Sequence, residues 1–305
     1  MGNKFRGLLV VSFWYILAPL SFYWLVTWTN STDLKLYNQF VRTFDLVSLD
    51  PSDLRLPLLY ATIWMTLVVF LGSLLARNAS VYDAYWSVAP IYFTLALPWF
   101  VAETLDARSI LFMMMVFAWG VRLTANWVYT WSGLNHQDWR YTELREKTGK
   151  WYPLVNLFGI HLFPTIMVYV AFLPSLYVFT GPSSFSFVDI LAFIIGAGAI
   201  LLQGTADFQM HQFRKHRKKG INQKGLWKYS RHPNYLGEVL FWTAVFLFGL
   251  SSGMDFWPGV LCPLAMLLMF IFISIPMMEK RQSKKPGWSE YVRKTGMLLP
   301  KRISK

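Results

Sequence analysis

The chain is dominated by long apolar runs that are separated by short polar segments. Eight runs meet or approach the roughly 20 residues that a helix needs to cross the hydrocarbon core of a bilayer. The runs cover residues 8–28, 56–76, 84–102, 110–131, 153–180, 187–206, 234–251 and 256–278. They are apolar nearly all round, whereas the strands of an outer-membrane barrel alternate in polarity. The pattern therefore predicts an all-α fold, a polytopic integral membrane bundle of about eight transmembrane helices.

Two of these runs raise separate questions. The run 8–28 is long for the apolar part of a cleaved signal and no A-x-A site follows it, so we expect a permanent helix. The run 153–180 contains Pro164 and Pro174, which leave open whether this segment is kinked or re-entrant. The longest predicted loop, 29–55, is too short to bury a core of its own. We therefore expect a single membrane domain over residues 1–305.

Composition and charge narrow the class of protein further. With 55% hydrophobic and 15% charged residues among 305, the balance excludes an ordinary soluble domain. The net charge is +13, and 17 of the 29 basic residues lie within 207–232 and 280–305. When the N-terminus is placed in the cytoplasm, 24 basic residues fall in cytoplasmic segments and four in outer segments. The positive-inside rule therefore selects eight helices with both termini cytoplasmic. A single cysteine, Cys262, and five scattered histidines make a metal site unexpected.

The run 187–206 carries polar residues along one side and continues beyond the apolar stretch. Gln203, Asp207 and Arg214 lie within about 40° of one another when each residue advances 100°. They form a narrow stripe on a helix that we expect to project into the cytoplasm. The alternative is a solvated helix end, with Lys215 and 217–219 binding anionic lipid head groups.

A second polar group begins the next helix, at Pro233, a residue suited to the first helical position. The free N–H groups there, beside Arg231 and His232, predict an anion site suited to phosphate. Asn234 and Glu238 are four residues apart and share one face a turn inside the membrane. A membrane-embedded acid is costly unless it is paired or used. The alternative for Glu238 is a pair with a basic residue of the tail.

Further polar residues belong to the same predicted half of the membrane. Asp83 opens the third run, Arg122 and Asn126 lie one turn apart on the fourth, and His161 lies near the start of the fifth. Arg122 needs an acid, a carbonyl or an anionic ligand, so a pair with Asp83 and a substrate contact are both open. A lone histidine such as His161 is more often a hydrogen-bonded core residue than a catalyst.

The segment RHPNYLGE at 231–238 follows DFQMHQFR at 207–214 and precedes EKR at 279–281 and GWSEYVRKTGMLLP at 287–300. With these segments the chain resembles the steroid 5-alpha-reductase family, in particular a branch known as a domain of unknown function. The resemblance covers 81–303, with the cofactor-binding part at 190–303, and leaves 1–80 less covered. It implies a membrane NADPH-dependent reductase of a carbon–carbon double bond conjugated to a ketone in a lipophilic substrate.

The resemblance also implies roles for particular residues. The residues expected to bind the cofactor match the family's motifs or lie next to matching positions. They are Gln203, Asp207, Arg214, Arg231, His232, Asn234, Glu238, Glu279 and Arg281. Gln203 stands where characterised steroid reductases carry Asn, which keeps the amide but adds a methylene. Asp83 is the nearest match to the family's acid, preceded by Tyr82 instead of Gln, and Trp119 stands at the position of a substrate-binding Tyr. These departures leave the steroid assignment open.

The reaction sets physical requirements of its own. A hydride delivered by the nicotinamide to the β-carbon of an enone creates negative charge on the carbonyl oxygen, which then needs a donor. Asp83 is the first candidate, because apolar surroundings favour a protonated carboxyl group. Arg122 is a candidate electrostatic helper and Tyr235 is the alternative acid. The expected substrate-binding residues are Trp86, Trp119 and Asn126.

Two other functions compete with the reductase. Isoprenylcysteine carboxyl methyltransferases, which use S-adenosylmethionine, share a related RHPxYxG helix start and an acid–arginine pair like Glu279 and Arg281. A non-enzymatic lipid-binding membrane protein is the other rival. In the leading interpretation a lipophilic molecule enters from the bilayer, membrane lipids surround the bundle and no nucleic acid is bound. The location is then a multi-pass position in the cytoplasmic membrane or endoplasmic reticulum, with the cofactor site on the cytoplasmic side.

Overall fold

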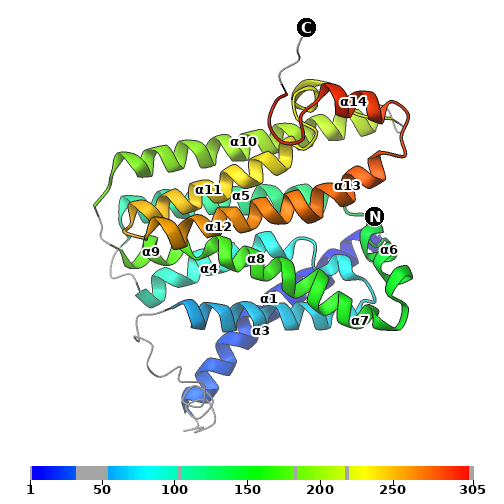
Figure 1. The fold of residues 1–305 in the computed structure, drawn as a ribbon. Coiled ribbons are helices and arrows are strands. Elements are labelled where there is room, and N and C mark those ends of the chain that lie inside the picture. Colours follow the sequence, from blue (N-terminus) through cyan, green and yellow to red (C-terminus); the bar gives the residue numbers. More distant parts are fainter. Residues whose placement is uncertain (1, 32–53, 102–104, 182–183, 217–219, 302–305) are drawn as a thin grey trace. The chain divides into compact units, whose positions relative to one another are not determined.

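The computed structural model describes residues 2–31, 54–101, 105–181, 184–216 and 220–301 (Figure 1). The structure is 82% helical, and the described residues form no strand. Ser230 and Gly296 make one isolated parallel bridge. The predicted all-α class is therefore confirmed. Most of the predicted loop 29–55 and the basic residues 217–219 lie outside the part of the chain that is described.

Seven helical stretches in the described part of the chain are long and apolar enough to cross a membrane. They are Asn3–Leu25, Arg55–Leu75, Ala107–Thr130, Trp139–Thr180, Phe187–His216, Pro233–Ser251 and Phe256–Gln282. The predicted run 84–102 also forms a helix, α4 (Tyr85–Val101), of which the structure describes 17 residues. A multi-pass membrane protein is therefore supported, while the count of eight and the sides of the termini remain predictions.

Some of the long apolar runs contain more than one shorter helix, but the α-helices follow the predicted runs closely. In addition to α4, they are α1 (Gly2–Ser31), α3 (Arg55–Leu75), α5 (Ala107–Thr130), α6 (Trp139–Thr148), α7 (Tyr152–Val155), α8 (Phe163–Phe172), α9 (Pro174–Thr180), α10 (Phe187–His216), α11 (Pro233–Ser251), α12 (Phe256–Met269), α13 (Ile275–Gln282) and α14 (Trp288–Lys294). The 3₁₀ turns are η2 (Ala79–Val81), η3 (Gly149–Trp151) and η5 (Gly225–Lys228), and the π-helical segments are η4 (Asn156–Leu162) and η6 (Phe270–Ser274).

The structure shows where α11 begins, how far α10 extends and where the segment 153–180 is interrupted. The helix α11 begins at Pro233, as expected from a residue that lacks an N–H and has a helical φ. The helix α10 continues to His216, well beyond its apolar part, as the polar stripe suggested. The segment 153–180 is interrupted by the π-helical turn η4 and by a turn at Leu173, before Pro174 starts α9. A proline cannot donate to the preceding turn, which explains this second interruption.

The described chain divides into two compact units. Unit 1 contains residues 1–93 and 123–169, and unit 2 contains residues 94–122 and 170–305. The boundary within α5 falls between Arg122 and Leu123. Each unit has its own buried residues, which are described separately below.

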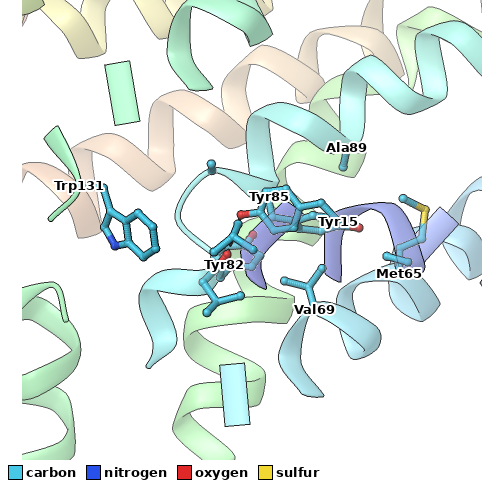
Figure 2. Close-up of a cluster of buried hydrophobic side chains, with 11 residues drawn as sticks. Tyr15, Met65, Val69, Tyr82, Tyr85, Ala89 and Trp131 are labelled. Atoms are coloured by element: carbon cyan, nitrogen blue, oxygen red, sulfur yellow. Dashed lines mark hydrogen bonds between the residues drawn. The ribbon is translucent and has the colours of Figure 1, made fainter. Parts of the chain in front are cut away.

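In unit 1, three tyrosines form the centre of the core (Figure 2). The rings of Tyr15 and Tyr85 have centroids 5.6 Å apart, and those of Tyr82 and Tyr85 are 5.8 Å apart. The Tyr15 hydroxyl donates a hydrogen bond of 2.6 Å to the carbonyl of Val81. This bond satisfies a buried hydroxyl and fixes the chain just before Asp83.

In unit 2, α10 and α11 make the most extensive helix–helix contact of the described residues, and glycines permit the close approach. A Cβ on Gly237 of α11 would meet the Gln203 side chain and would lie 3.0 Å from the Ala199 carbonyl oxygen. A Cβ on Gly196 would meet the Met115 side chain, whereas one on Gly198 would have no neighbour within 4 Å.

Unit 2 also contains an ion pair that the sequence did not suggest. Arg108 is the second residue of α5 and its side chain is completely buried, as is that of Asp189 on α10. Two hydrogen bonds join them. Arg108 Nε donates to Asp189 Oδ1 at 2.8 Å, and Arg108 Nη2 donates to Asp189 Oδ2 at 3.2 Å. The Ser186 amide also donates to Asp189 at 2.8 Å, and Arg108 donates to the Ser184 carbonyl. Although the charge count placed Arg108 in an outer loop, its charge is therefore neutralised inside the protein.

Candidate functional site

The main polar cluster of unit 2 is built around Arg122 of α5. Its Nη1 donates to Asp207 Oδ2 at 2.9 Å, and its Nη2 donates to Gln203 Oε1 at 2.5 Å. Glu238 of α11 lies 3.9 Å from the same guanidinium group. Arg122 thus finds two acidic partners within its own unit, instead of the Asp83 partner considered above. We call these four residues the Arg122 cluster.

Glu238 is held from a second direction by tryptophan. The Trp119 indole Nε1 lies 3.3 and 3.2 Å from the two carboxylate oxygens and donates to them. The ring of Trp119 stacks on Phe241 with centroids 4.4 Å apart and an angle of 9°. Glu238 is only 5% exposed and Trp119 is fully buried. The acid is therefore fixed between α5 and α11, and its ionic partner among the described residues is Arg122.

Two hydrogen-bond donors in the Arg122 cluster have no acceptor within the part of the chain that the structure describes. They are Arg122 Nε and Gln203 Nε2, both buried. An unsatisfied buried donor is costly, and such groups in native proteins call for an explanation. Together with the carboxylates of Asp207 and Glu238, they offer both donors and acceptors to a polar ligand.

Basic side chains gather at the end of α10 and at the end of α13. Arg214 is exposed on the last turn of α10, and Arg281 is exposed on α13. The pKa of Lys285 lies below its ordinary value, mainly because burial disfavours the charged form and also because Arg214 and Arg281 are nearby. Three cations from two distant segments, the end of α10 and residues 281–285, therefore share one region, which favours an anionic group.

A second cluster surrounds the start of α11. The Arg231 Nε donates to Glu279 at 2.7 Å, and its Nη1 donates to the carbonyl of Thr295 at 2.6 Å. His232 Nε2 lies 3.1 Å from the same Glu279 oxygen. Arg231 therefore connects α11 with α13 and with the segment after α14. Glu279 contacts both Arg231 and His232.

Tyr235, the alternative acid, has an aromatic environment. Its ring stacks on His232, with centroids 5.3 Å apart and an angle of 4°, and on Phe270, with centroids 4.8 Å apart. Phe270 begins the π-helical segment η6. Asn234 lies on the first turn of α11 and is half-buried. The stacking fixes the Tyr235 ring near the second cluster.

The remaining predicted residues belong to unit 1. Trp86 packs against the tyrosine core, and Asn126 is half-buried on the last part of α5. Asp83 lies in the turn before α4 and accepts a hydrogen bond of 2.6 Å from the Tyr141 hydroxyl. Residue spacing does not predict this contact, because 58 residues separate the two side chains in the sequence. Asp83 thus connects the start of α4 with α6.

The acidity of Asp83 departs from that of an exposed carboxyl group. Burial raises the pKa of Asp83 to about 6, although nearby Arg140 and the Tyr141 hydrogen bond act in the opposite direction. An ordinary aspartate in the unfolded chain has a pKa of about 3.9. The folded protein therefore holds this proton over a pH range in which the unfolded chain has lost it.

This difference predicts a pH dependence of stability. The stabilisation from protonated Asp83 is complete below about pH 4 and is lost as the pH rises through about 6, by at most about 3 kcal/mol. Asp83→Asn keeps an acceptor for Tyr141 but cannot ionise. We expect the free energy of unfolding of the parent, relative to that of this variant, to fall between pH 4 and 7 in denaturant titrations. A constant difference across this range would contradict the prediction.

The fold and these clusters define a multi-pass helical membrane protein with a partly buried arginine–carboxylate site. The chain belongs to the family described as a protein of unknown function (DUF1295), whose model matches residues 69–295. It is 28% identical over 204 residues to an uncharacterized protein of Schizosaccharomyces pombe. That alignment covers 58% of this chain and 59% of the relative, so the chain spans less than two thirds of its length. No solved structure gives a significant match.

The family match confirms the unknown-function branch that the sequence resembled. All the predicted site residues, from Asp83 to Arg281, lie within the matched range 69–295. The connection to steroid 5-alpha-reductases remains a proposal.

Proposed function

We propose that this protein is a membrane-embedded, NADPH-dependent reductase of a carbon–carbon double bond conjugated to a ketone in a lipophilic substrate. The Arg122 cluster is the observation that carries the proposal. A partly buried guanidinium group, two carboxylates and an amide meet there from three helices, and two donors have no acceptor among the described residues. A lipid-binding scaffold has no need for this costly arrangement.

The residues present fit the chemical groups of NADPH. A nicotinamide carboxamide carries one carbonyl acceptor and two N–H donors, which match the free donors of Arg122 and Gln203 and the carboxylates of Asp207 and Glu238. Arg214 and the neighbouring cations would hold the phosphates. When bound, the cofactor supplies the hydride.

The second cluster would support this site from the start of α11. Its contacts to Glu279 and to the Thr295 carbonyl already engage Arg231, so we assign this side chain to positioning the helix start. The backbone N–H groups after His232 and the positive end of the helix remain favourable for a phosphate. Asn234 and Tyr235 belong to this first turn.

Asp83 remains our candidate for donating to the substrate carbonyl. Its pKa of about 6 means that a substantial fraction of the carboxyl groups is protonated in mildly acidic conditions. Tyr235 is the alternative donor. Trp119 is completely buried and is occupied by Glu238, so we assign it to holding that acid, while Trp86 and Asn126 remain candidates for contact with the substrate. The high basic charge of 207–232 and 280–305 favours a cytoplasmic cofactor side.

A methyltransferase that uses S-adenosylmethionine is the second candidate. The observation that favours it is the second cluster, since Arg231, His232 and Glu279 form a compact ionic site at the RHPxYxG helix start. The Arg122 cluster favours the reductase, because binding of S-adenosylmethionine does not explain the hydrogen-bond donors and acceptors around Arg122.

Thermal melting of the purified full-length protein distinguishes the two candidates. A ligand at about 100 times its dissociation constant stabilises the native state by roughly 2.7 kcal/mol, which is visible as a higher melting temperature. We expect NADPH to produce this rise and S-adenosylmethionine to leave the melting temperature unchanged. Stabilisation by the methyl donor alone would exclude the reductase.

A further inference from the structure

His161 of unit 1 lies in the π-helical segment η4 and has no solvent exposure. Its Nδ1 lies 2.9 Å from the carbonyl oxygen of Asn156. Because a carbonyl oxygen only accepts, Nδ1 carries the hydrogen of this bond. An unpaired imidazolium charge in such a place would be very costly, so the ring is neutral and Nε2 is a hydrogen-bond acceptor.

This acceptor has no donor within the described residues, since His161 Nε2 makes no hydrogen bond. Asn156, at the other end of the same π-helical segment and 3% exposed, likewise leaves its side-chain oxygen without a donor. A buried acceptor that lacks a donor costs roughly 1–3 kcal/mol. π-Helical turns within α-helices are found frequently at functional sites. Two unsatisfied acceptors on one such segment therefore indicate a ligand that brings a donor.

The surroundings of the His161 ring are apolar and aromatic. Its centroid lies 5.1 Å from that of Phe70 and 4.8 Å from that of Tyr82. The segment also belongs to the stretch Trp139–Thr180, which is apolar enough to cross a membrane. A group that reaches this nitrogen is therefore attached to an apolar molecule.

Two hydroxyl groups beside this segment, those of Thr165 and Tyr82, are already engaged in a directed chain. Thr165 Oγ1 donates to the carbonyl of His161 at 2.7 Å, so it accepts the 2.7 Å bond that it shares with the Tyr82 hydroxyl. Tyr82 is consequently the donor in that bond. Neither hydroxyl hydrogen remains for His161 Nε2, while both bonds fix the position of the ring.

We propose that His161 Nε2 is a binding site for the hydroxyl group of an apolar molecule, such as a long-chain or sterol-like alcohol. The site lies within unit 1 and needs no cofactor. It therefore goes beyond the proposed reductase activity, and the loss of either proposal leaves the other standing.

The test compares two probes that differ only in the donor, 1-hexadecanol and its methyl ether, 1-methoxyhexadecane. Each is titrated into the full-length protein in detergent, and the apparent affinity is taken from the rise in melting temperature. We expect the alcohol to bind about fivefold more tightly than the ether, as one net hydrogen bond allows. Equal affinities would overturn the proposal and leave a buried water as the partner of His161.

Three variants test whether the difference in affinity between the alcohol and the ether depends on the His161 ring. His161→Phe, which has no acceptor, should bind the two probes equally, whereas His161→Gln retains an acceptor near the same position and should keep part of the preference. His136→Phe, at an exposed histidine of the same unit, should keep all of it. A preference for the alcohol that survives in His161→Phe would overturn the proposal.

A spectroscopic measurement covers the case in which His161→Phe does not fold. In protein labelled with ¹⁵N histidine, the His161 signals are identified by their loss in His161→Gln. We expect the Nε2 resonance of the parent to shift on addition of 1-hexadecanol and to stay constant with the ether. If the Nε2 resonance does not shift on addition of 1-hexadecanol, the proposed binding site at His161 is wrong.

Discussion

Arg108→Met will lower the free energy of unfolding by about 3–5 kcal/mol, the usual effect of removing one partner from a buried ion pair. Arg108 and Asp189 are both completely inaccessible to solvent and form two hydrogen bonds. Without the guanidinium group, the Asp189 carboxylate keeps its Ser186 contacts but lacks a compensating charge. Unfolding in mixed detergent micelles, followed by circular dichroism, measures the change.

The matched control is an ion pair of similar length on the surface. Lys294 Nζ lies 2.6 Å from Glu290, one turn away on α14, and both side chains are more than half exposed. Lys294→Met should change the free energy of unfolding by less than about 1 kcal/mol, because water and salt screen an exposed pair. The double variant Arg108→Met with Asp189→Leu should recover much of the loss, since apolar groups can replace a buried pair. Equal effects of Arg108→Met and Lys294→Met would show that the buried pair is not important for stability.

Asp207→Ala and Glu238→Ala are expected to weaken NADPH binding at least about 30-fold, following the proposed function. Truncating one partner of a buried, hydrogen-bonded charge pair typically costs 2–5 kcal/mol in affinity. Each variant also deprives Arg122 of an acidic partner at 2.9 or 3.9 Å. The measurement is the dependence of the melting temperature on NADPH concentration. If both variants bind NADPH like the parent, the cofactor site is not at the Arg122 cluster.

Two controls separate loss of the site from loss of the fold. Glu290→Ala removes an exposed acid from the same unit and should bind NADPH like the parent. Gly237→Ala keeps every charge, but its Cβ meets Gln203, so we expect roughly tenfold weaker binding from the displaced amide. Gly198→Ala, on α10 with no neighbour within 4 Å of the added Cβ, should have no effect. Equal NADPH affinities of Gly237→Ala and Gly198→Ala would show that the position of Gln203 does not matter for binding.

The helices were predictable from the sequence because lipid imposes one local requirement. Each spanning segment must satisfy its own backbone hydrogen bonds, so an apolar run of sufficient length is helical whatever its neighbours are. The start of α11 at Pro233 and the extension of α10 to His216 were predictable for similar reasons, since local backbone chemistry and spacing determine them. The run 84–102 likewise forms a helix, α4, over its described residues Tyr85–Val101.

The partners of the polar residues were decided by the tertiary structure. Spacing placed Gln203 and Asp207 on one side of a helix, but only the packing of α5 beside α10 brought Arg122 to both. In the same way, only the tertiary structure brought Glu279 to Arg231, which belongs to a distant segment.

The sequence by itself therefore determined a basic, helical, multi-pass membrane protein with polar stripes on two of its helices. The tertiary structure decided that Arg108 is buried against Asp189 and that Glu238 lies between Trp119 and Arg122. The physical reason is the range of the forces. Helix formation in lipid depends on residues within one turn, whereas an ion pair depends on which faces of distant helices come within a few ångströms.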